Sequence, residues 1–180
     1  MSEKPEENSV GLERLKKAVL FPEVKFAMWG LVFMLIMGVF YREFSRPFFG
    51  DLSVEEQVFA GYMLSLAHGH SFALFFLIPI GLAFATYLVG DKLSEESIEK
   101  IAKLFKIYAI AAIGTYALLF YKGVWWVTQY EPGAGIGLTE VDESLYGGSV
   151  ALRSIVYAAF HTTFGVISIW YAVKLSKHMK

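Results

Sequence analysis

Three histidines within long apolar stretches are the residues of this 180-residue chain best suited to chemistry. His68, His70 and His161 lie in runs without Asp, Glu, Lys or Arg, whereas His178 lies in the polar tail and is assigned no role. Ionisable side chains inside a membrane are costly and usually functional, and neutral imidazole is a common metal ligand. The three histidines therefore predict a ligand site. For any one of them, a purely structural bond to a neighbouring hydroxyl or carbonyl is the alternative.

The spacing of the histidine pair narrows the chemistry. His68 and His70 are about 200° apart around a helix, so they face opposite sides and are poorly placed to chelate one metal ion. Two ligands on opposite faces suit a helix that lies between two planar cofactors. Gly69 and its small neighbours would let a porphyrin approach the backbone, although close helix packing explains small residues equally well.

Cationic side chains and indole rings near the outer ends of the predicted helices could bind heme propionates. Arg42 and Arg153, with Trp125 and Trp126, offer the charged and N–H donors that a propionate needs. Ordinary anchoring at the membrane interface is the alternative. The predicted cofactor-binding residues are His68, His70, His161, Gly69, Arg42, Arg153, Trp125 and Trp126, and the predicted metal ligands are His68, His70 and His161.

The elements that must position these residues are membrane-spanning helices. The chain is 56% hydrophobic and 18% charged, against about 25% charged for soluble domains. Four uncharged runs, with short extensions, reach the roughly 20 residues that a spanning helix needs. The sequence predicts an all-α integral membrane four-helix bundle. Its helices are expected near residues 23–43, 54–89, 95–129 and 149–175, with a kink at Pro79 and a glycine-rich loop over 131–148.

The predicted organisation has three parts. Residues 1–22 form a polar tail and a short basic amphipathic helix, which lies on the membrane surface and ends at Pro22. Residues 23–175 form the transmembrane domain, and residues 176–180 are a tail. Twelve of the 16 Lys and Arg residues fall on one side of this arrangement, which predicts that both termini are cytoplasmic.

Composition also excludes several classes of protein. The net charge of −1 provides no basic surface for nucleic acid, so membrane lipid is the expected partner. The absence of cysteine excludes disulfides, iron–sulfur clusters, thiolate zinc sites and covalently attached heme. No cleavable signal peptide is expected, because the first 25 residues are charged and lack an apolar core.

The segment from Leu66 to Pro79, LAHGHSFALFFLIP, resembles the second helix of heme–copper oxidase subunit I. Its His-x-His pair is also similar to the tenth helix of that subunit, where the two histidines serve different hemes. The resemblance implies one four-helix arc of the oxidase plan, which has three such arcs. The chain lacks the oxidase's paired copper histidines and its His–Tyr motif, so the resemblance does not extend to oxygen reduction.

The chain as a whole resembles a small uncharacterised prokaryotic family of four-helix membrane proteins. The motifs are Tyr41-Arg-Glu-Phe44 (YREF), His68-x-His70 and the histidine of the last helix. This resemblance implies a multi-pass protein of the prokaryotic cytoplasmic membrane and carries no known function.

These observations favour a b-type heme protein in which each heme joins His68 of one protomer to His70 of the next, in a homotrimer or, second, a homodimer. A six-coordinate heme implies electron transfer rather than gas binding. His161 is the rival axial ligand. Three other hypotheses stay open: a copper or zinc site that uses all three histidines, a proton or ion transporter, and an assembly subunit. The transporter is weakened because no carboxylate is evident within the second or fourth helix.

Overall fold

The computed structural model describes residues 11–49, 66–129 and 138–179, and these residues are almost entirely helical. The long helices are α2 (Phe21–Phe49), α4 (Ile78–Leu88), α5 (Glu95–Gln129) and α7 (Val150–Ser176). Four continuous helical segments are long and apolar enough to cross a membrane: Gly11–Phe40, Leu66–Leu88, Glu95–Trp126 and Val150–Ser176. The predicted all-α, four-helix membrane fold is therefore confirmed.

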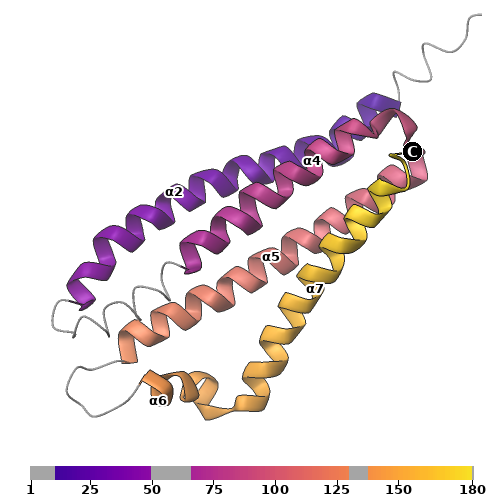
Figure 1. Ribbon diagram of the computed structural model, residues 1–180. Coiled ribbons are helices and arrows are strands. Elements are labelled where there is room, and N and C mark those ends of the chain that lie inside the picture. The colour runs from indigo at the N-terminus through magenta and orange to yellow at the C-terminus, as the bar shows by residue number, and fades with distance from the viewer. Residues whose placement is uncertain (1–10, 50–65, 130–137, 180) are drawn as a thin grey trace, which may run out of the picture.

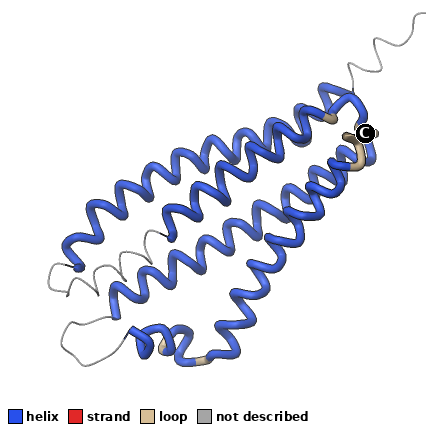
Figure 2. The backbone as a smooth tube through the Cα atoms, viewed as in Figure 1, coloured by secondary structure: helices blue, strands red, loops and turns tan. Residues whose placement is uncertain are grey.

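The four segments run side by side with α2 next to α4 and α5 next to α7 (Figure 1). The start of α2, the end of α4, the start of α5 and the C-terminus gather at one end of the bundle. The short helix α6 (Leu138–Glu143) lies at the opposite end. Few residues of the described chain lie outside helices (Figure 2). The connection from α4 towards α5 contains a short 3₁₀ turn, Gly90–Lys92.

Many large apolar side chains lie on the surface of the bundle. Tyr108 and Tyr171 are fully buried, while Ile110, Ile155 and Ile169 are each about two-thirds exposed. Large aliphatic side chains facing outward along whole helices are unfavourable in water and favourable against lipid. The exposed faces therefore agree with the membrane setting that hydropathy predicts.

The N-terminal segment differs from its prediction, because the helix does not end at Pro22. Residues 11–49 are helical throughout, with a π-helical turn at Lys16–Leu20, where the Phe21 N–H bonds the Lys16 carbonyl. This wider turn carries the chain past a proline that cannot donate a hydrogen bond. The segment packs on the bundle, with Arg14 paired to Glu95 and Glu99 at 2.6 and 2.5 Å.

Near Pro79, where a kink is expected, the helix contains a π-helical turn, Ala73–Leu77. The Ile78 N–H bonds the Ala73 carbonyl, so the Leu74 carbonyl loses its usual partner, and Pro79 has no N–H to replace it. The Tyr108 hydroxyl of α5 donates to this carbonyl at 2.6 Å. The distortion caused by Pro79 therefore becomes a buried link between two spans.

The remaining boundaries are mostly as predicted. The Ser149 side chain caps α7 by accepting from the Leu152 N–H at 3.2 Å, and Ser94 accepts from the Ser97 N–H at the start of α5. Two predictions were wrong: α2 continues to Phe49, and the 131–148 loop contains α6 and a 3₁₀ turn. The predicted helix start near residue 54 lies outside the described residues.

Candidate functional site

His70 has the geometry of an oriented ligand. Its Nδ1 lies 2.8 Å from the Leu66 carbonyl one turn earlier, and the side chain is half-buried. A carbonyl can only accept, so Nδ1 carries the proton and the lone pair is on Nε2. Histidine ligands to metals commonly have their second nitrogen bonded in this way, because the bond fixes the ring and raises its basicity. Nε2 has no hydrogen-bond partner in the part of the chain that the structure describes.

His68 lies against α2, on the other side of its helix. A Cβ built on Gly38 would be 3.0 Å from the imidazole Cε1, so glycine leaves the room that this ring occupies. The Nδ1 atom of His68 is buried and has no partner among the described residues. Buried polar atoms in proteins are rarely unpaired, so this nitrogen calls for a partner from outside the described chain.

The two histidines flank the inward face of the helix formed by residues 66–72. The buried Ala67 and Ser71 mark the inward direction, and His68 and His70 lie on either side of it. Gly69 is exposed, and a Cβ built on it would meet nothing within 4 Å. The outer face between the two histidines is therefore not covered by the described residues of the protomer.

His161 lies on α7 and is exposed. Its ring centroid is 6.4 Å from that of Tyr157, whose hydroxyl donates to the Leu118 carbonyl of α5 at 2.9 Å. No group of three His, Asp or Glu side chains able to hold a metal ion occurs in the described ranges. The three histidines are thus not gathered within one protomer, as the copper or zinc hypothesis would require.

Three of the residues predicted to bind propionates, Arg153, Trp125 and Trp126, lie at the α6 end of the bundle, together with Lys122. Arg153 and Lys122 each lie 2.6 Å from a carboxylate oxygen of Asp142, and the Trp126 indole N–H donates to the same carboxylate at 3.3 Å. The Trp125 indole N–H donates to the Ser144 hydroxyl at 3.1 Å.

Asp142 is therefore the centre of an ion cluster joining α5, α6 and α7. Burial raises the pKa of Asp142, but the hydrogen bond and charge of Lys122, with the charge of Arg153, outweigh burial and hold the pKa below the usual aspartate range. A propionate bound here would compete with this carboxylate. The side chain of Arg42 lies outside the described part of the structure.

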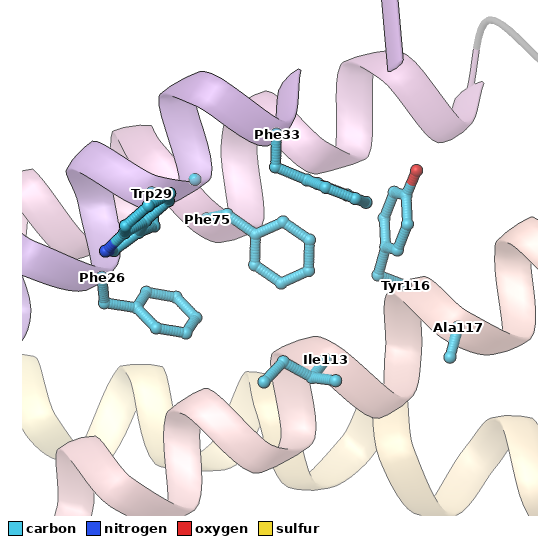
Figure 3. Close-up of a pocket in the computed structure, with 8 residues that line it drawn as sticks. Phe26, Trp29, Phe33, Phe75, Ile113, Tyr116 and Ala117 are labelled. Atoms are coloured by element: carbon cyan, nitrogen blue, oxygen red, sulfur yellow. The ribbon is translucent and has the colours of Figure 1, made fainter. Parts of the chain in front are cut away.

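An apolar pocket of about 300 Å³ opens between α2, the π-helical turn before α4, and α5 (Figure 3). Its walls are mainly aromatic. The ring centroids of Phe33 and Phe75 each lie 5.2 Å from that of Tyr116, and they lie 5.7 Å from one another. No histidine lines this pocket. Its rings pack mainly against one another.

A second polar site, which the sequence did not suggest, lies near the end of the bundle that holds the C-terminus. The fully buried Glu23 of α2 accepts a hydrogen bond from the Tyr171 hydroxyl of α7, and Tyr171 is 3.0 Å from the Thr86 hydroxyl of α4. The sequence pattern that points to this site is the spacing of positions 15, 19, 23 and 27, which lie about one helical turn apart and are all buried. It was missed because Pro22 was interpreted as a helix end.

Comparison with known proteins identifies a family without identifying a function. Residues 22–141 match the family described as "Protein of unknown function (DUF2871)". No curated protein and no solved structure matches, so the resemblance of residues 66–79 to an oxidase helix stays a prediction. The matched region contains Glu23, His68 and His70, and it covers more than half of the sequence, so the chain belongs to this family.

Proposed function

We propose that the protein is a membrane-embedded b-type heme protein that transfers electrons, with His68 and His70 as axial ligands in a homo-oligomer. The observation that carries the proposal is the state of His70. Its Nδ1 is committed to the Leu66 carbonyl at 2.8 Å, while its Nε2 is free of described protein partners within an apolar span. An imidazole held in this way is ready to bind iron.

The surroundings of the pair fit a porphyrin. Gly69 leaves the outer face of the helix open, and the unpaired Nδ1 of His68 is a second buried nitrogen with unused bonding capacity. A bis-histidine heme supplies one-electron transfer at a potential that its ligands and burial adjust. The chain's own contribution is to orient two imidazoles and to keep them in an apolar environment.

The open face implies that a second copy of the chain completes each site. His68 and His70 point to different sides of one helix, so one protomer does not present both to the same iron. A contact between the two different faces either closes into a ring or grows without limit. The oxidase resemblance favours a ring of three members over one of two. The exposed His161 of a neighbouring copy is the rival second ligand.

The charge distribution supports an orientation in the prokaryotic cytoplasmic membrane. The end of the bundle that holds the C-terminus also carries the lysines of the α4–α5 connection and of the tail. Cytoplasmic loops are enriched in such residues, so both termini are assigned to the cytoplasm. The Asp142 cluster then lies at the outer surface.

The test is the absorption spectrum of the protein purified from heme-replete cells. We expect a low-spin Soret band that shifts on dithionite reduction, with sharp α and β bands. Mass measurement in detergent gives the number of chains in the coloured species. A colourless protein would overturn the proposal, and a coloured monomer with full low-spin heme would overturn the shared site.

A further inference from the structure

The Glu23 cluster is a buried carboxyl group held by hydroxyls from two other helices. Glu23, Thr86 and Tyr171 each have essentially no exposed surface. Tyr171 donates to Oε1 of Glu23, while Oε2 is buried and has no partner. The cluster thus joins α2, α4 and α7 around a single carboxyl group with one oxygen unused.

No positive charge among the described residues compensates this carboxyl group. The titratable group that faces Glu23 is Tyr171 from α7, and α4 contributes only the neutral hydroxyl of Thr86. No Lys, Arg or His pairs with Glu23 in the described part of α2, α4, α5 or α7, nor in the π-helical turn before α2. An isolated carboxylate in an apolar interior is very costly, whereas the neutral acid is tolerated.

We propose that Glu23 is a proton-binding site within the membrane domain, with the proton carried on Oε2 and the carbonyl oxygen Oε1 held by Tyr171. This role is independent of heme. Release of the proton leaves a bare charge between three helices, so it requires water to reach the site. Proton binding at Glu23 is therefore linked to the packing of α2 against α4 and α7.

The site lies where protons can be exchanged with one side of the membrane. Thr86 is in the last turn of α4, and Tyr171 is within about two turns of the end of α7. Both helix ends lie at the end of the bundle that carries the C-terminus. Movement of the helix ends is enough to admit water, and the spans need not separate over their length.

The experiment is infrared spectroscopy of the full chain in phosphatidylcholine vesicles across a pH series. We expect the carbonyl stretch of a protonated carboxylic acid at neutral pH, shifted to lower frequency in D₂O and lost at alkaline pH. Glu23→Gln should remove the band. Tyr171→Phe should keep it but move it to higher frequency, because the carbonyl oxygen loses its donor.

Two matched variants serve as controls. Asp142→Asn should leave the band unchanged, because Asp142 is paired with Lys122 and Arg153 and is ionised. Tyr157→Phe removes a hydroxyl that donates to a backbone carbonyl instead of a carboxyl group, so it should not shift the band.

Three results would overturn the proposal: no acid band at neutral pH, a band that persists in Glu23→Gln, or a band that sodium ions abolish at constant pH. The last would make the cluster a cation site. Tyr171→Phe keeps the carboxyl group, so the question stays answerable if Glu23→Gln does not fold. The band does not depend on heme, so its failure and the failure of the heme proposal are separate outcomes.

Discussion

The two polar sites within the membrane spans differ in where their partners come from. Glu23 is enclosed by its own chain, with hydroxyls from α4 and α7 and no exposed surface. His68 and His70 flank a helix face that the chain leaves open at Gly69, and each has a nitrogen without a described protein partner. We call the Glu23 site the closed site, because it has room only for a ligand as small as a proton. We call the His68–His70 site the open site, because its exposed face leaves room for a cofactor or a second copy of the chain.

Replacement of His70 should have the largest effect, because the proposed heme site loses one of its two axial ligands. We expect His70→Ala to lower the heme-to-protein ratio by more than about tenfold, since even residues that only orient a ligand change metal affinity by about 10–100-fold. Pyridine hemochromogen absorbance measures the ratio.

Three variants complete this test. His178→Ala, in the tail, should leave heme content unchanged. His68→Ala and His161→Ala distinguish the two candidates for the second ligand, because only the true ligand converts the remaining heme to high spin. An unchanged low-spin spectrum in His70→Ala would exclude His70 as a ligand and remove the contrast between the two sites.

A substitution at the closed site should lower the stability of the protein and leave its heme content unchanged. Tyr171→Phe removes the donor to Glu23 and leaves Oε1 buried without a partner, which costs about 1–3 kcal/mol. We expect a lower midpoint of unfolding in detergent with an unchanged heme-to-protein ratio. Tyr157→Phe is the matched control, because its half-buried hydroxyl donates to a carbonyl and its loss should cost less. Loss of heme in Tyr171→Phe would show that the two sites are not independent.

Hydropathy was enough to predict the fold and to single out the two histidines of the open site, whose role as ligands stays a prediction. Apolar runs of spanning length fix the number of helices, and histidine is conspicuous in such a run whatever it packs against. The caps at Ser94 and Ser149 were predictable because side-chain capping is a local interaction.

The closed site was not predictable, because it depends on how a helix passes a proline. Pro22 favours a helix end by local rules, yet the π-helical turn Lys16–Leu20 keeps the helix continuous and places Glu23 in the buried series. The pairing of Asp142 with Lys122 and Arg153 was likewise hidden, since it joins three elements through α6. The partners of Asp142 come from three elements, so this pairing leaves no periodic pattern in the sequence.

The ion cluster at the α6 end should make a smaller, pH-dependent contribution. The folded-state pKa of Asp142 is lowered, so its stabilising effect is complete above the ordinary aspartate pKa and is lost as pH falls through the lowered value. We expect Asp142→Asn to cost about 1 kcal/mol near neutral pH, because the cluster is partly exposed.

Unfolding midpoints measured from neutral to acidic pH test this expectation. The wild-type midpoint should fall towards that of Asp142→Asn in acid, and the two curves should converge. A constant difference between the variants across the series would contradict a contribution from the charge of Asp142.

The smallest effect on the protomer is expected at Gly69, and it tests whether the open face is covered in the assembly. A methyl group at this position meets nothing within 4 Å, and alanine is favoured over glycine in a helix by about 1 kcal/mol. Gly69→Ala should therefore leave a lone protomer as stable as before or slightly more so. If a porphyrin and a neighbouring chain lie on this face, the same methyl group lowers heme content and shifts the mass measured in detergent towards the monomer.

Gly30→Ala is the control for a covered glycine: its Cβ would overlap the Phe75 carbonyl, so it should destabilise the protomer outright. A Gly69→Ala protein with wild-type heme content and assembly would mean that the face is open to lipid alone.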